Sequence, residues 1–157
     1  MPVVETLEPG SPLAERLAVV TFALTFYCLG TTYFEAFVNH RTWHLVGPRE
    51  FPANHQALTP RVVAVMLFPT GVYALSLVAL LVLHPASISR TAIATSLALV
   101  GIAIVSSALV QVPIQRQLGS TGVTAALPER LISTDLVWRK VPLGLNAVLR
   151  LAAFRSS

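Results

Sequence analysis

Residues 62–83 read VVAVMLFPTGVYALSLVALLVL, a run of 22 residues without a charged side chain. Two more runs of the same length, residues 17–38 and 91–112, are almost as apolar, and Glu35 is their only charged residue. The hydrocarbon core of a bilayer is about 30 Å thick, and an α-helix needs about 20 residues to cross it. Lipid offers an open backbone no hydrogen-bond partners, and the alternation of β-barrel strands is absent. The runs therefore predict three transmembrane helices.

The composition of the chain supports this prediction. Of 157 residues, 54% are hydrophobic and only 11% are charged, whereas soluble domains contain about 25% charged residues. So few charges cannot coat a globular surface in water. The net charge of +4 fits basic loops that meet lipid headgroups. Because no Lys/Arg cluster of a nucleic-acid-binding face is present, we expect no nucleic-acid partner.

A fourth apolar segment, residues 131–154, carries three basic residues and one acidic residue. Pro128 suits the first turn of a helix, where its missing N–H costs nothing. Pro142 is expected to kink that helix in its middle. We interpret the segment as a fourth transmembrane helix with its charges near the two ends. The alternative is an amphipathic helix that lies flat in the membrane interface.

The predicted fold is therefore all-α: a four-helix transmembrane bundle with up-down-up-down topology. The whole chain, residues 1–157, is expected to form one integral membrane domain. A long ordered loop, residues 39–61, would connect the first two helices, and its three prolines make it stiff and irregular. The transmembrane helices are predicted near residues 14–40, 61–84, 90–113 and 128–154.

The distribution of basic residues predicts an orientation. Four helices place both termini at the same end of the bundle. Four basic residues lie at that end, and seven lie at the opposite end with the two long loops. Because cytoplasmic loops carry an excess of Lys and Arg, we expect the termini on the non-cytoplasmic side.

Polar residues form a stripe along each of three predicted helices. Such residues are costly in lipid and usually face the bundle interior, so we expect the stripes to meet. We expect Glu35 to be buried there and paired with a basic group, most simply Arg139. The stripes consist of Thr21, Thr25, Cys28, Thr32, Glu35 and Asn39 in the first helix, Ser107, Gln111 and Gln115 in the third, and Asp135, Arg139, Pro142, Asn146 and Arg150 in the fourth.

The stripes are richest at the end that holds the long loop, which adds His40, His44 and His55. We interpret this convergence as a polar pocket roofed by the loop, with the three histidines facing inward. The alternative is a structural network in which Glu35 and Arg139 only hold the bundle together. A metal bound by Glu35 and the three histidines is a further alternative, although no tight motif such as H-E-x-x-H is present.

Three stretches of sequence support a comparison with a known family. The first helix ends in YFEAFVNH (residues 33–40), the third closes with VPIQRQL (residues 112–118), and the fourth carries Trp138 and then NAVLR (residues 146–150). Over residues 17–154 the chain resembles the anthrone-oxygenase-like family of small four-helix integral membrane proteins, as a distant bacterial-type branch in a bacterial-type plasma membrane. It departs from the family pattern at Arg41, where a proline is expected after His40.

The resemblance implies oxygenation of a flat, electron-rich phenolic ring by O2 without an obligatory cofactor. A base would remove an acidic proton, and the resulting anion would react with O2 directly. We therefore expect no cofactor and no metal ligand. The expected catalytic residues are Glu35, His40, His44 and Arg139. The expected substrate-binding residues are Asn39, Trp43, His55, Arg61, Gln111, Gln115, Trp138 and Asn146.

Two other classes of function stay open. One is a non-catalytic membrane protein, such as a subunit of a complex, an assembly factor or a lipid-binding module. The other is a small transporter or channel, although repeated halves and discontinuous helices are missing from the sequence. The expected partners are the lipid bilayer and a hydrophobic small molecule, and a homo-oligomer is compatible with the sequence.

Overall fold

The structure is a computed structural model that describes residues 10–122 and 126–155. Its described part contains no strand and consists of four long helices, each made of successive segments. The first helix runs through α1 (Pro12–Phe34) and a π-helical turn (Glu35–His40) to a 3-10 turn (Trp43–Leu45). The second comprises α2 (Phe51–Val62), a π-helical turn (Val63–Leu67) and α3 (Phe68–Leu83). The third comprises α4 (Arg90–Ser106), a π-helical turn (Ser107–Gln111) and α5 (Val112–Thr121). The fourth comprises α6 (Ala126–Asp135), a π-helical turn (Leu136–Lys140) and α7 (Val141–Arg155).

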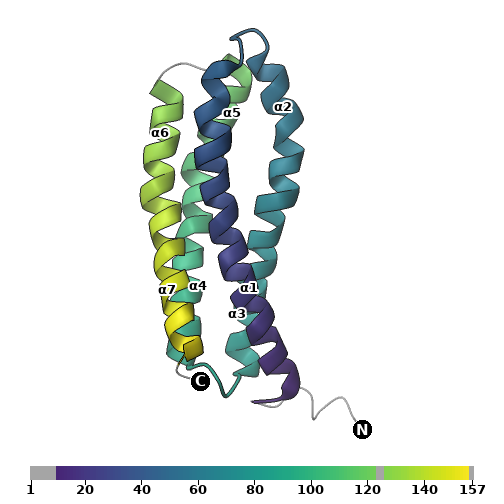
Figure 1. The fold of residues 1–157 in the computed structure, drawn as a ribbon, viewed down its shortest axis with the longest axis vertical. Helices are drawn as coiled ribbons and strands as arrows, with labels where there is room; N and C mark the ends of the chain where they lie inside the picture. The colour runs from purple at the N-terminus through teal and green to yellow at the C-terminus, as the bar shows by residue number, and fades with distance from the viewer. Residues whose placement is uncertain (1–9, 123–125, 156–157) are drawn as a thin grey trace.

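The four helices lie side by side along the long axis of the molecule (Figure 1). At one end, the start of α1 meets the link after α3, where the Gly10 N–H donates to the His84 carbonyl at 3.0 Å. The last turns of α7 lie at this same end (Figure 1), which we call the terminal end. The opposite end holds α2, α5 and α6 together with the link 46–50 (Figure 1), and we call it the cavity end for reasons given below.

Local signals set the helix boundaries at the terminal end. The Ser11 and Ser89 hydroxyls accept hydrogen bonds from the N–H groups of Ala14 and Ala92, which satisfies one free donor at the start of α1 and of α4. His84 ends α3 in a left-handed conformation with φ of 43°. The following residue, Pro85, cannot continue a helix. His84 thus terminates the second helix.

The outer surface of the bundle is apolar. Three of the helices, Pro12–Leu45, Phe51–Leu83 and Arg90–Thr121, are long and apolar enough to cross a membrane. Exposed Leu, Val, Ile and Phe side chains occur along all four helices, whereas the interior contains many hydroxyls and several charges. A soluble protein would not expose so much apolar surface. The structure therefore has the character of a helical membrane protein.

Between residues 131 and 154, the fourth helix carries its charges inward. Asp135, Lys140 and Arg150 are buried, and the Arg139 side chain is only 12% exposed. The surface of α7 is built from apolar residues such as Val141, Leu145 and Val148. The low hydropathy of this segment thus comes from charged side chains that point into the bundle rather than toward its outer surface.

The two tryptophans offer a test of this surface. Trp138 on the fourth helix is 52% exposed, whereas Trp43 is 6% exposed. In vesicles containing brominated phospholipid, we expect strong quenching of Trp138 fluorescence in Trp43→Phe and weak quenching of Trp43 fluorescence in Trp138→Phe. If bromine quenches both variants equally, or if the aqueous quencher iodide rather than bromolipid reaches Trp138, this face of the fourth helix does not meet lipid.

The prediction of a long loop between the first two helices was wrong. The first helix continues to Leu45 and the second begins at Phe51, so the link comprises only residues 46–50. Pro52 is accommodated in the first turn of α2, where its missing N–H is not needed. At 1.5 Å per residue the helices are about 50 Å long and exceed the apolar core of a bilayer. The polar ends of the helices extend past the predicted spans and keep their helical structure.

A π-helical turn interrupts each of the four helices. Three of these turns end two residues before a proline, namely Pro69, Pro113 and Pro142. A proline cannot donate to the carbonyl four residues earlier and its ring pushes that carbonyl aside. Neighbouring hydroxyls take over two of the freed carbonyls: Tyr27 Oη donates to Val65 O at 3.0 Å and Ser106 Oγ to Trp138 O at 3.1 Å. Helices tolerate prolines in membranes through such replacements.

Candidate functional site

The polar stripe of the first helix faces the bundle interior, as predicted. Thr21, Thr25, Cys28, Thr32 and Glu35 are all buried. Most of these hydroxyls return hydrogen bonds to carbonyls of their own helix, as between Thr21 Oγ1 and Leu17 O at 2.6 Å. The hydrogen-bonding capacity of these buried hydroxyls is therefore used within their own helix.

A polar cluster occupies the middle of the bundle interior. The Tyr73 hydroxyl on α3 lies 2.9 Å from Thr25 Oγ1 and accepts a hydrogen bond from Asn146 Nδ2 at 2.7 Å. Tyr73 and Asn146 are completely buried. This contact joins α1, α3 and α7. Asn146 is not among the residues that line the cavity described below, and its role in substrate binding stays a prediction.

A charged cluster lies above it, where the π-helical turns of the first and fourth helices meet. Glu35 is 5% exposed, and its Oε2 lies 3.7 Å from Arg139 Nη2. Arg139 Nη1 also approaches Asp135 Oδ1 at 3.0 Å, and the Lys140 ammonium donates to Asp135 Oδ2. His40 Nε2 lies 3.7 Å from Glu35 Oε1. The predicted pairing of buried Glu35 with Arg139 is confirmed, within a cluster of two carboxylates and two cations.

A cavity of about 610 Å³ adjoins this cluster at the cavity end. The second helix supplies a mainly apolar wall with Leu58, Val62, Val63, Met66 and Leu67. The first, third and fourth helices supply a mainly polar wall. That wall contains Glu35, Asn39, Trp43, Ser107, Gln111, Gln115, Arg116, Ser120 and Arg139. The arrangement suits a ligand with one apolar face and one hydrogen-bonding face.

Gln111 has unused hydrogen-bonding capacity in the cavity wall. Its residue is 3% exposed, and neither its amide oxygen nor its amide nitrogen has a hydrogen-bond partner among the described residues. Buried amides are normally paired, and an unpaired one costs about 1–3 kcal/mol. One turn further along the same helix, Gln115 is satisfied by His55 Nε2 at 2.7 Å from its Oε1. Gln111 is therefore the group that a bound molecule would complete.

Aromatic rings close the cavity toward the link 46–50. The Trp43 ring lies 4.5 Å from His40, 5.5 Å from Phe51 and 5.9 Å from His55, measured between ring centroids. Phe51 is completely buried, as is Leu118 on α5, which packs in the same apolar cluster. The roof of the cavity is thus a packed group of side chains from helices rather than the predicted irregular loop.

The cavity brings together seven of the twelve predicted site residues: Glu35, Asn39, Trp43, His55, Gln111, Gln115 and Arg139. Their assignment to catalysis or binding stays a prediction. His40 is buried beside Glu35 but does not line the cavity. His44 and Arg61 are exposed, and Trp138 lies on the outer surface. The expectation that all three loop histidines face inward is therefore wrong for His44. It lies in the 3-10 turn Trp43–Leu45, whose tighter winding takes it off the face that His40 occupies.

Some residues in and beside the cavity wall were not predicted from the sequence. Gln56 and Thr59 line the cavity because α2 is a helix rather than a loop. Lys140 is the second cation of the charged cluster, and its burial was not predicted. The prolines at positions 69, 113 and 142 were the available signal for the π-helical turns that surround the cavity.

The alternative metal site finds no support in the geometry. The described residues contain no group of three or more His, Cys, Asp or Glu side chains that could hold a metal ion. His44 is exposed and His55 is engaged by Gln115, so the four proposed ligands do not converge.

Comparisons with known proteins leave the family open. No protein-family model, no curated protein and no solved structure matches this chain. The cavity and the residues around it are therefore the features from which we infer a function.

Proposed function

We propose that the protein binds a lipophilic small molecule, an aromatic ring system with one or more oxygen substituents, in the cavity between its helices. The observation that carries this proposal is the combination of a 610 Å³ cavity with the buried, unpartnered amide of Gln111 in its wall. The apolar wall of the second helix would take a ring face, and the amide and Arg139 would bind its oxygens.

The proposal extends to the membrane. We propose that all four helices cross the bilayer, since the charges of the fourth are buried against the other three. An oily ligand concentrates in lipid and would enter the cavity from there. Of the exposed Lys and Arg side chains, five lie at the cavity end and three at the terminal end. This distribution supports an orientation with the cavity end toward the cytoplasm and the termini on the other side.

We also propose a reaction, the oxygenation implied by the anthrone-oxygenase-like pattern. The supporting observation is that a histidine and a guanidinium line one cavity. With Gln115 Oε1 as acceptor, His55 Nε2 carries the proton and Nδ1 has a free lone pair. His55 would take the acidic proton of a phenolic substrate, Arg139 would stabilise the anion, and O2 would add to the anionic carbon. Glu35 is the weaker candidate for the base because it is already paired with the Arg139 guanidinium.

Tryptophan fluorescence tests the binding site directly. In Trp138→Phe, Trp43 is the single tryptophan and lies in the cavity wall. Titration with a hydroxylated anthracene should quench Trp43 with a saturable curve. Gln111→Leu should weaken this binding by about tenfold or more, because a hydrogen bond to the ligand is lost. O2 uptake during the same titration would reveal oxygenation.

Two variants control this titration. In Gly119→Leu, a Cβ atom would lie 3.2 Å from His55 Nδ1 and the side chain would enter the cavity, so saturable quenching should vanish. Gly71→Leu adds the same side chain at an exposed position with no atom within 4 Å of the new Cβ, and should bind normally. Quenching that is linear in ligand and equal in all variants would show partition into lipid and refute the site. Saturable binding without O2 uptake would support binding and reject the oxygenase reaction.

A further inference from the structure

Arg150 lies in the bundle interior at the terminal end, far from the cavity described above. Its residue is 1% exposed. One guanidinium nitrogen, Nη2, donates to the Ala18 carbonyl on α1 at 3.4 Å, which is a long hydrogen bond. The other two nitrogens, Nε and Nη1, have no hydrogen-bond partner among the described residues. Buried charges are normally paired, so this guanidinium, with one long hydrogen bond, has capacity left for a ligand.

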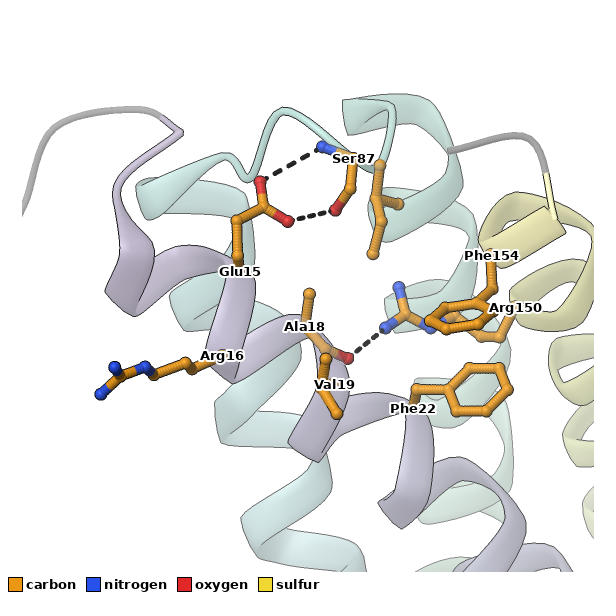
Figure 2. A pocket seen from close by; sticks show the side chains of 9 residues that line it. Glu15, Arg16, Ala18, Val19, Phe22, Ser87, Arg150 and Phe154 are labelled. Carbon is orange, nitrogen blue, oxygen red and sulfur yellow. Dashed lines mark hydrogen bonds between the residues drawn. The ribbon is translucent and has the colours of Figure 1, made fainter.

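A second cavity, of about 260 Å³, lies against this side chain (Figure 2). Its walls are mainly apolar and include Val19, Ile88 and the stacked rings of Phe22 and Phe154, whose centroids are 4.7 Å apart. Arg150 precedes the end of α7 by five residues, which is about 8 Å along a helix. The site therefore lies just inside the end of the bundle.

The two other charged residues of this cavity do not neutralise Arg150. The Glu15 carboxylate is directed to the link after α3, where it accepts hydrogen bonds from Ala86 N at 2.8 Å, Ser87 N at 3.3 Å and Ser87 Oγ at 2.5 Å. Figure 2 shows the Arg16 guanidinium directed away from Arg150. Among the described residues, no carboxylate forms an ion pair with Arg150. The Arg150 guanidinium is thus a buried cation in the cavity wall that no carboxylate of the described residues pairs with.

We propose that this second cavity binds the oxyanion head, carboxylate or phosphate, of an anionic membrane amphiphile. The free Nε and Nη1 groups lie on different edges of the Arg150 guanidinium, and each can donate to the oxyanion. Together with the second hydrogen of Nη2, either one would form the two-point contact by which arginine holds carboxylates and phosphates best. The apolar walls formed by Val19, Phe22 and Phe154 would hold the first methylenes of an acyl chain. The remaining chain would run down the exposed apolar surface of α1 and α7.

Native mass spectrometry of the full chain in detergent tests the proposal with four probes: oleate, phosphatidylglycerol, phosphatidylcholine and inorganic phosphate. We expect oleate or phosphatidylglycerol to bind the native chain and raise its melting temperature. Phosphatidylcholine, whose head has no net charge, should bind about tenfold more weakly. Tight binding of oleate alone would identify a fatty-acid carboxylate as the ligand. Tight binding of phosphatidylglycerol alone would identify a lipid phosphate. Binding of inorganic phosphate as tight as that of either lipid would overturn the role of the acyl chain.

Matched variants separate the site from non-specific lipid adhesion. Arg150→Met should lose about 10- to 100-fold in affinity, the usual cost of a charge-assisted hydrogen bond. Arg150→Lys should retain part of it, and Arg90→Met, at an exposed position of the terminal end outside the cavity wall, should bind like the native chain. Should Arg150→Met fail to fold, Val19→Trp serves instead, because it fills the cavity from an exposed position and leaves Arg150 intact. Equal binding of the anionic lipids to Val19→Trp and the native chain, or no preference for them over phosphatidylcholine, would overturn the proposal.

Discussion

Asp135→Leu should destabilise the bundle more than any other single change to its charged residues. Asp135 is buried and holds both Arg139, at 3.0 Å, and Lys140. Its loss would leave these two cations in the interior with Glu35 as their only carboxylate. Removing one partner of a buried ion pair costs about 3–5 kcal/mol. Thermal unfolding in mild detergent should show a correspondingly large fall in the melting temperature.

Two variants make this expectation specific. Glu129→Leu removes an exposed carboxylate from the same helix and should change the stability by less than about 0.5 kcal/mol. Asp135→Leu combined with Lys140→Met restores the balance of one carboxylate and one guanidinium, and should recover a large part of the lost stability. A melting temperature for Asp135→Leu equal to that of Glu129→Leu would show that the cluster does not stabilise the fold.

The helical fold could be predicted from the sequence because two strong constraints coincide. The apolar run of residues 62–83 is long enough to cross a bilayer, and lipid leaves the backbone no choice but internal hydrogen bonds. The spacing of Thr21, Thr25, Cys28 and Thr32 identified the inner face of the first helix correctly. Such periodicity is reliable where a polar group must avoid lipid.

The cavity end was harder to predict because those constraints weaken there. Residues 39–60 contain three prolines and several polar groups, a composition typical of a loop. Pro52 and Pro60 are nevertheless part of a helix, because the first lies in its opening turn and the second near the end of α2. Once that helix is known, the contribution of Gln56 to the cavity follows.

The fourth helix shows a related limit. Its hydropathy is lowered by Asp135, Arg139, Lys140 and Arg150, which sequence alone placed near the helix ends. The first three instead form a cluster at the π-helical turn, where one extra residue per turn changes which side chains face inward. That local change brings Lys140, five residues after Asp135, into hydrogen-bonding contact with its carboxylate. A regular 3.6-residue periodicity does not pair positions five apart.

Glu35→Ala should reduce the stability of the bundle, and its effect on ligand binding can be measured separately. Without this carboxylate, Arg139 and Lys140 share Asp135 alone, and we expect a loss of about 3 kcal/mol, at the lower end of the range for a broken buried pair. The loss should be smaller than for Asp135→Leu, because the two contacts of Glu35, at 3.7 Å each, are longer than those of Asp135. Thermal unfolding and Trp43 quenching in the Trp138→Phe background measure the two effects separately.

The isosteric variant Glu35→Gln separates the role of charge from that of shape. It keeps the volume and a hydrogen-bonding oxygen toward Arg139, but it removes the negative charge and so frees the guanidinium for a ligand. If Arg139 binds an anionic ligand oxygen, Glu35→Gln should bind a phenolate at least as tightly as the native chain, although its melting temperature is lower. If Glu35 instead accepts the ligand's proton in a hydrogen bond, binding of a neutral phenol should fall by about tenfold. Unchanged affinity and unchanged stability in both Glu35→Ala and Glu35→Gln would place this carboxylate outside the site and outside the forces that hold the bundle together.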